Sequence, residues 1–306
     1  MIILTYHNIV RQPPNVFNDV VRKWDKVNAF ERQMQMLVER FRVVPLREIV
    51  QAIRAGKTLE RTCAITFDDG YRGNYLYAAP ILERLGFTAA FFVITQRVRE
   101  AGRYAPVDFD RLEVLLQLTK ATQADLTEFG LGVVPLADDE AKLAFIKKLT
   151  KQLKVTPAAI KKDLDASLER QLAVPEEKIA AALEQEAYQM LNWEEIEDLQ
   201  RRGFAIGSHT RTHPSLSQID EAQLEFEIGG SFQDLRERLA LRDITLAYPF
   251  GKAEHISAAT VAMAQRAGYA CALTSIKEIN TPTTDVFQLR RIGFKDLMKM
   301  NGTNAQ

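Results

Sequence analysis

Short apolar runs alternate with longer amphipathic segments along most of this chain, and this alternation limits the folds open to it. Expected strands cover residues 1–7, 42–46, 63–67, 88–95, 204–209, 244–250, 269–274 and 287–294. Expected helices cover residues 30–41, 47–56, 73–86, 192–203, 221–239 and 257–268. Such repetition favours an α/β fold with a parallel sheet, and this many units favour closure into a distorted (β/α) barrel. Periodicity alone does not separate a closed barrel from an open, doubly wound sheet.

Residues 99–190 break this rhythm. They hold no convincing strand, and their apolar residues recur at helical spacing in four segments, 110–121, 138–153, 156–172 and 175–190. We therefore expect a single barrel domain, built from residues 1–98 and 191–306, with a helical insertion at 99–190. Three roles for the insertion stay open: covering the site, selecting a substrate, and forming a homo-oligomer.

Composition excludes several classes of function. Of the 306 residues, 40 are basic and 40 are acidic, and no basic patch stands out, so we expect no nucleic-acid partner. The first residues lack the basic start of a signal peptide, and no apolar run reaches membrane-spanning length, which predicts a cytoplasmic protein. Cys63 and Cys271 lie in separate apolar segments and are expected to be buried, inert thiols.

Asp68 and Asp69 are adjacent carboxylates that directly follow an expected strand. Because like charges repel, the pair needs a cation, a shared proton or full solvation. The carboxyl ends of strands in parallel α/β proteins face the active site, and Gly70 allows the backbone to turn sharply there. The alternative is that Asp-Asp-Gly is only a turn.

His209 and His213 are spaced i, i+4 after another expected strand, and the chain has only four histidines. If the backbone turns helically there, the two imidazoles can share a metal ion; otherwise they are surface residues of a loop. Two histidines and one carboxylate would leave a coordination position open, as in catalytic zinc sites. Such an ion would neutralise one aspartate and leave the other free to act as a base.

Three motifs now carry a family resemblance. Residues 66–71 (TFDDGY), 208–213 (SHTRTH) and 247–251 (AYPFG) resemble the first three motifs of the polysaccharide deacetylase family, the NodB-homology domain of carbohydrate esterase family four. The resemblance covers the chain from Met1 to about Thr95 and from about Leu191 to Phe294. It implies a distorted (β/α) barrel and metal-dependent removal of acetyl from an N-acetylated sugar, with metal-bound water as the nucleophile.

The resemblance also implies roles for individual residues. Asp68 corresponds to the general base, and Asp69, His209 and His213 to the ligands of one divalent ion, for which we expect zinc, with nickel, cobalt or iron as alternatives. The backbone N–H of Phe250, where the family usually has tyrosine, corresponds to the oxyanion donor.

Two positions depart from the family pattern. Ala247 stands where an arginine normally pairs with the base, so Arg290 or Arg291 is a candidate substitute; the alternative is that both only decorate a strand edge. No histidine follows His255 to supply the late general acid, and we expect His255 itself on the surface.

His7, after Tyr6, provides a candidate acid. An early Tyr-His pair resembles the branch of the family that deacetylates poly-N-acetylglucosamine, where that motif supplies the acid. Imidazole suits this role because its pKa lies near neutrality. The alternative is a histidine that only makes hydrogen bonds within the barrel.

These features predict a metal-dependent hydrolase that removes acetyl from an amino sugar or glycan. A hydrolase of a small non-sugar amide would use the same chemistry. A catalytically inactive, sugar-binding barrel is the alternative of another class, and Ala247 gives it some support.

Overall fold

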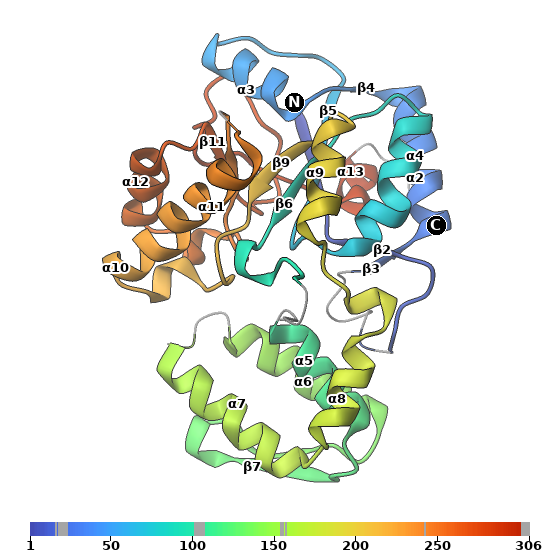
Figure 1. The fold of residues 1–306 in the computed structure, drawn as a ribbon, viewed down its shortest axis with the longest axis vertical. Helices are drawn as coiled ribbons and strands as arrows, with labels where there is room; N and C mark the ends of the chain where they lie inside the picture. Colours follow the sequence, from blue (N-terminus) through green and yellow to red (C-terminus); the bar gives the residue numbers. More distant parts are fainter. Residues whose placement is uncertain are drawn as a thin grey trace.

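The computed structural model describes residues 1–15, 17, 24–100, 108–153, 156, 158–241 and 243–300, and its central feature is a parallel sheet curled into a half-barrel (Figure 1). The strands are hydrogen-bonded in the order β1-β5-β6-β9-β10-β11, and β4 also pairs with β5. Their bounds are β1 Ile2–Tyr6, β4 Arg42–Val43, β5 Thr62–Phe67, β6 Ala90–Val93, β9 Ala205–Ser208, β10 Thr245–Ala247 and β11 Cys271–Leu273. This architecture confirms the predicted (β/α) barrel fold.

Helices cover the outside of the sheet between these strands (Figure 1). They are α2 Val27–Arg40, α3 Leu46–Arg54, α4 Ala79–Arg84, α9 Trp193–Arg201, α10 Glu221–Leu224, α11 Gly230–Leu239, α12 Ala258–Ala267 and α13 Phe294–Met300. Helix α9 begins at a capping box: the Asn192 side chain accepts from the Glu195 N–H at 2.8 Å, and the Glu195 carboxylate accepts from the Asn192 N–H at 3.1 Å. The first helical turn thereby gains two partners for its open N–H groups.

The segment Leu289–Ile292 closes the sheet. We predicted a strand over residues 287–294, but the structure shows only isolated parallel bridges there. Leu289 pairs with Leu273 of β11 on one side, and Ile292 pairs with Leu4 of β1 on the other. The chain thus joins the last strand of the sheet to the first, which brings residues near both ends of the sequence to one site.

Strand side chains alternate between two buried clusters, as the period of two requires. Ile65, Phe67 and Phe91 pack toward the surrounding helices with residues of α2, α4 and α9. Ala64 and Phe92 belong to the other cluster, which lies across the inside of the curled sheet and against α3. The sheet is therefore buried on both faces, as is usual for parallel sheets.

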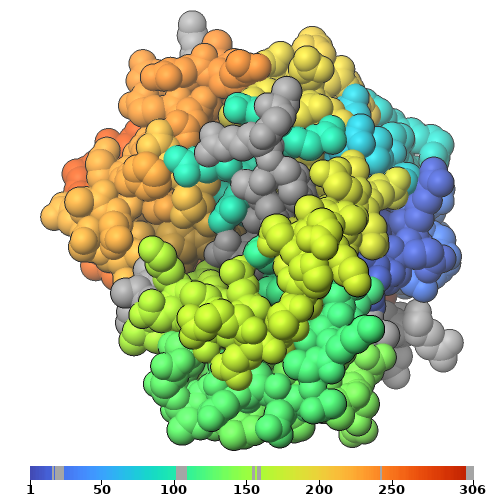
Figure 2. Space-filling model, turned by 60° about the horizontal axis from the view of Figure 1, so that its bottom comes forward, coloured from blue at the N-terminus to red at the C-terminus, as the bar shows by residue number. Residues whose placement is uncertain are grey.

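The insertion forms a lobe at one end of the barrel (Figure 1) and lies at the front, in green and yellow-green, in Figure 2. Its helices are α5 Asp108–Leu118, α6 Asp139–Leu153, α7 Ala158–Leu172 and α8 Glu176–Leu183. The prediction that it holds no strand was wrong: β7 Gln123–Leu126 and β8 Gly132–Pro135 pair antiparallel. These four-residue strands each bury alternate side chains, a pattern too short to recognise in the sequence. The boundaries at residues 98 and 191 stay a prediction.

The insertion has an apolar core that includes residues from the start of the chain. Val10, Phe17 and Trp24 lie in one buried cluster with the apolar residues of α5 to α8. Val10 and Trp24 belong to a small parallel pair, β2 Asn8–Val10 and β3 Trp24–Lys26. The segment after β1 thus connects the barrel to the insertion.

Two further expectations concern the cysteine thiols and membrane-spanning helices. Cys63 and Cys271 are fully buried free thiols, as predicted, and burial raises the pKa of each to about 12, which keeps both protonated. Among the described residues, we find no helix with the length and apolar character needed to cross a membrane.

The packing predicts a large cost for truncating Phe91. Its ring is 1% exposed, stacks on Phe67 with centroids 4.9 Å apart and meets Phe204 edge-on. We expect Phe91→Ala to lower the free energy of unfolding by about 3–5 kcal/mol in urea denaturation, because it leaves a cavity. Phe226→Ala is the control, since that ring is 45% exposed and its loss should cost less than about 1 kcal/mol. Equal costs for the two variants would contradict this account.

Candidate metal centre and active site

Asp69, His209 and His213 converge at the carboxyl ends of β5 and β9. The Nε2 atoms of His209 and His213 lie 3.5 and 3.6 Å from the same Asp69 oxygen, Oδ1, and the imidazole centroids are 4.8 Å apart. One potential ligand atom from each of the three residues lies within 4.8 Å of the others. Asp69 and His209 are buried and His213 is nearly so, which limits their exchange with water.

This donor set fits a divalent transition metal. Two imidazole nitrogens and one carboxylate are the ligands of many catalytic zinc sites. Separations of 3.5 to 3.6 Å exceed those of an ordinary hydrogen bond, and they resemble the spacing of donors that share one ion. His209 Nδ1–H donates to the Ala247 carbonyl at 2.7 Å, which fixes the tautomer and leaves Nε2 facing the cluster.

The charges in this cluster support one another. Burial by itself raises the pKa of Asp69, but the imidazoles of His209, His7 and His213 outweigh it and hold this pKa well below its usual range. Burial by itself lowers the pKa of His209, but the carboxylates of Asp68 and Asp69 raise it above the usual value. Asp69 is therefore ionised and available to a cation.

Asp68 has a different partner, Arg291. Two guanidinium nitrogens of Arg291 donate to the two Asp68 oxygens at 2.6 and 2.8 Å, and Arg291 Nε–H donates to the Thr274 carbonyl at 2.8 Å. Both side chains are at least 95% buried. Arg290 points elsewhere and pairs with Glu278 at the surface. Of the two arginines that we considered, Arg291 is the one that contacts Asp68.

This ion pair sets the protonation state of Asp68. Burial alone raises the pKa of Asp68, but Arg291, with help from His209 and His7, lowers it below the usual value. The carboxylate is consequently ionised at neutral pH although it is buried. A bidentate arginine also fixes the orientation of the carboxylate.

Strained backbone gathers at the same place. Asp69, Thr210, His213 and Phe250 have φ between 60 and 71°, a left-handed conformation that non-glycine residues rarely adopt. Only three other non-glycine residues among those described share it. Strain of this kind persists where surrounding contacts impose it, and it often marks functional sites.

His7 and Phe250 are the two remaining candidate site residues, one near the start of the sequence and one after β10. His7 directly follows β1, and its backbone carbonyl accepts from the Asn74 amide at 2.6 Å. Its imidazole acts electrostatically on both aspartates, because its charge lowers the pKa of Asp68 and of Asp69. The Phe250 ring lies 4.8 Å from that of His213, centroid to centroid.

His255 is buried, so the expectation of a surface residue was wrong. Its side chain is 2% exposed, and its ring lies 5.4 Å from that of Phe250. Its Nδ1 accepts from the Lys252 N–H at 3.4 Å. Phe250 and His255 both lie in the irregular segment after β10, where no strand or helix periodicity indicates which side chains are buried.

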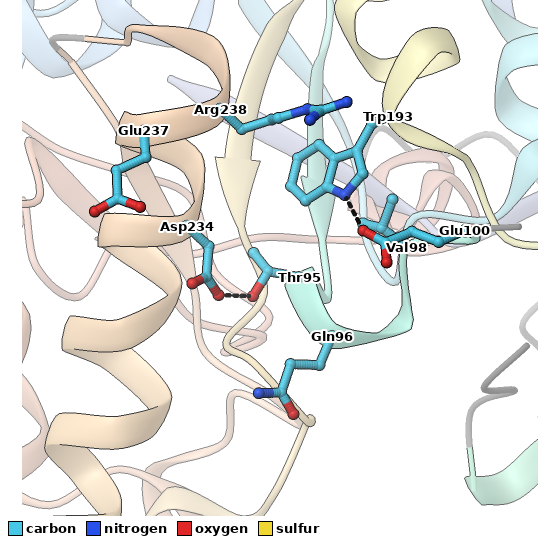
Figure 3. Close-up of a pocket in the computed structure, with 8 residues that line it drawn as sticks. All are labelled: Thr95, Gln96, Val98, Glu100, Trp193, Asp234, Glu237 and Arg238. Carbon is cyan, nitrogen blue, oxygen red and sulfur yellow. Dashed lines mark hydrogen bonds between the residues drawn. The ribbon is translucent and has the colours of Figure 1, made fainter. Parts of the chain in front are cut away.

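A hollow of about 400 Å³ lies between α9 and α11 (Figure 3). It adjoins the loop that carries the two histidines, because the Thr95 and Gln96 N–H groups donate to the Thr210 and Arg211 carbonyls. Trp193 is partly exposed here, and its indole N–H donates to Glu100 at 3.1 Å. The lining residues are Thr95, Gln96, Val98, Glu100, Trp193, Asp234, Glu237 and Arg238.

Comparisons with known proteins agree with this geometry. The family described as polysaccharide deacetylase matches residues 55–131 and 145–272, which is more than half of the chain. No curated protein sequence matches this chain. Among solved structures, a Streptococcus pyogenes deacetylase, PplD, in complex with acetate has 18% identity and a TM-score of 0.60, with 98% of this chain and 96% of that chain covered.

Two further structures share the fold. IcaB from Ammonifex degensii has 17% identity and a TM-score of 0.60, with 97% of this chain and 95% of that chain covered. A de-N-acetylase from Aggregatibacter actinomycetemcomitans has 13% identity and a TM-score of 0.55, with 96% of this chain and 95% of that chain covered. At these identities the likeness concerns the fold.

The Asp68–Arg291 pair predicts a distinctive effect of Arg291→Met. Removing the guanidinium leaves a buried carboxylate uncompensated, which should cost about 3–5 kcal/mol of stability. The pKa of Asp68 is lowered in the native protein, so its contribution is present at neutral pH and is lost as the pH falls through that lowered value. In Arg291→Met the pKa rises, and the acid limb of the activity profile should move to higher pH.

Arg290→Met is the matched control. The Arg290 guanidinium makes a surface ion pair with Glu278. Its loss should change the free energy of unfolding by less than about 1 kcal/mol and leave the pH profile of activity unshifted. Urea denaturation and the pH dependence of kcat/KM measure both effects. An unshifted acid limb in Arg291→Met would show that this arginine does not tune Asp68.

Proposed function

The chain belongs to the polysaccharide deacetylase family, enzymes that hydrolyse N-acetyl amide bonds, and on this basis we propose that it is a metal-dependent N-deacetylase of an amino sugar within a glycan. The observation that carries the proposal is the buried cluster of Asp69, His209 and His213, directly beside the ionised Asp68. The candidate ligands and the candidate base thus lie together at the carboxyl ends of the strands, where enzymes of this architecture act.

Asp69, His209 and His213 would hold the ion, and zinc is our first expectation because its catalytic sites use these ligands. When bound, such an ion supplies a Lewis acid that polarises the acetyl carbonyl and acidifies water. The strained backbone at Asp69 and His213 orients their side chains before any ligand arrives.

Asp68 would act as the general base. Its carboxylate is ionised despite burial, because Arg291 compensates its charge, and it lies next in sequence to Asp69. It would take a proton from the attacking water as the new C–O bond forms. Arg291 would keep the carboxylate oriented, so that the proton moves to a fixed position.

His7 and Phe250 would complete the reaction. The His7 imidazole would give a proton to the departing amine nitrogen as the C–N bond breaks, which yields acetate and the free amino sugar. The Phe250 backbone N–H would stabilise the negative charge that develops on the carbonyl oxygen. Support for His7 is its position at the end of β1 and its electrostatic influence on both aspartates.

The hollow between α9 and α11, next to the loop that carries the two histidines, supports a glycan rather than a small amide as substrate. The Trp193 indole provides an aromatic surface, and the second oxygen of the Glu100 carboxylate can accept a hydrogen bond from a sugar hydroxyl. Homo-oligomerisation through the insertion and cytoplasmic localisation stay predictions.

Acetate release tests the proposed function. Zinc-reconstituted protein should release acetate from N-acetylglucosamine oligomers with a lower KM than from the monomer. Asp68→Asn should lower kcat by about 10²- to 10⁴-fold, because it removes the base. Asp139→Asn, an exposed position in α6, is the matched control and should retain activity.

Two outcomes would redirect the proposal. Ring-opening hydrolysis of small cyclic amides, without acetate release from the oligomers, would favour the non-sugar amidohydrolase. Bound zinc without any hydrolysis would favour the inactive, sugar-binding barrel.

His7→Ala tests the general acid. We expect it to retain zinc, because His7 is not among the proposed ligands, and to lose about 10²- to 10⁴-fold in kcat. Zinc content by elemental analysis and kcat by acetate release measure the two properties separately. An unchanged kcat would eliminate His7 as the acid.

A further inference from the structure

Helix α5 is the part of the insertion that reaches the candidate active site. Two consecutive residues of this helix, Phe109 and Asp110, each contact a barrel residue next to the proposed machinery. Phe109 meets Phe250, and Asp110 meets Tyr71. These contacts connect α5 directly to residues beside the proposed site.

The contact of Asp110 with Tyr71 is a buried hydrogen bond. Both side chains are fully buried, and the Tyr71 hydroxyl lies 3.0 Å from each Asp110 oxygen, to which it donates. Hydrogen bonds to an ionised acceptor are shorter and stronger than neutral ones.

Tyr71 stands two residues after Asp69, at the end of a tight turn. Asp69 and Gly70 both have positive φ, and a Cβ added to Gly70 would lie 3.3 Å from Val93 Cγ1. The turn therefore has little room to relax, and it joins Tyr71 closely to Asp69.

The chain that leaves the insertion holds the same turn from the other side. The Leu191 N–H donates to the Gly70 carbonyl at 2.9 Å, and the Arg72 N–H donates to the Gln189 carbonyl at 2.8 Å. Tyr71 also packs with Met190 and Ile94 in a small buried cluster. The insertion thus contacts Tyr71 both through α5 and through its last residues.

Phe109 makes the second contact. Its ring meets that of Phe250 edge-on, with centroids 6.0 Å apart. Phe250 has a φ of 60°, and its ring also lies against those of His213 and His255. Phe109 completes the packing around a residue whose backbone is strained and whose N–H we assign to the oxyanion.

We propose that α5 positions the reaction centre: Asp110 orients Asp69 through Tyr71, and Phe109 supports the backbone of Phe250. Asp110 and Phe109 are positioning residues, since neither would touch the reacting atoms. This inference rests on the proposed function, and it makes the insertion part of the active site. Loss of the Asp110 contact should weaken metal binding, whereas loss of the Phe109 contact should slow the reaction without weakening metal binding.

Zinc affinity, measured by competition with a chelator, tests the first contact independently of activity. We expect Tyr71→Phe and Asp110→Ala each to lower zinc affinity by about 10- to 100-fold, as loss of support around a ligand does. The double variant should lose no more than either single variant, because both remove the same contact. Asp110→Asn, which keeps an acceptor oxygen, should recover part of the loss.

Arg111→Ala is the matched control on the same helix. Arg111 pairs with Glu169 and Glu176 inside the insertion, so its loss should lower Tm without changing zinc affinity. Phe109→Ala should lower kcat severalfold and retain zinc. Tyr71→Phe removes only a hydroxyl, so it keeps the test valid even where Asp110→Ala fails to fold.

The outcomes separate this inference from the proposed function. Zinc affinity that is unchanged in both Tyr71→Phe and Asp110→Asn, with Tm lowered as in Arg111→Ala, would make the contact purely structural and overturn the inference alone. Wild-type protein that neither binds zinc nor releases acetate would overturn both.

Discussion

Repulsion between the adjacent carboxylates of Asp68 and Asp69 is the constraint around which the site is organised. Both are buried, and neither can remain ionised there without a positive partner. The structure gives each aspartate a separate partner: Arg291 pairs with Asp68, while the imidazoles of His209 and His213 face Asp69. Each carboxylate can then serve a different purpose, although they are neighbours on the chain.

Closure of the sheet makes these partners available. Arg291 lies in the short segment that joins β11 to β1, 223 residues from Asp68 in the sequence. The same curvature brings the ends of β1, β5, β9 and β10 to one rim. Asp69, His213 and Phe250 at this rim have positive φ angles, and the side chains of these residues lie close together. The insertion is attached at this rim as well, through Tyr71 and Phe250.

Much of the fold could be predicted because its signals are local. The capping box at Asn192 and the apolar periodicity of most strands and helices depend only on nearby residues. The β7–β8 pair was missed because each strand has four residues, and Pro135 argues against a strand. His255 was placed on the surface because nothing near it in sequence indicates that the Phe250 ring covers it.

The sequence by itself determined which residue types stand at the carboxyl ends of the strands, because a strand of period two followed by a polar motif is a local pattern. It also offered Arg290 and Arg291 as candidate partners of Asp68, and the alternation of side chains along an extended segment allows only one of these neighbours to point inward. Only the tertiary structure decided that Arg291 points inward and that Asp110 meets Tyr71. Both contacts join distant segments, and they depend on how the sheet closes and where the insertion docks.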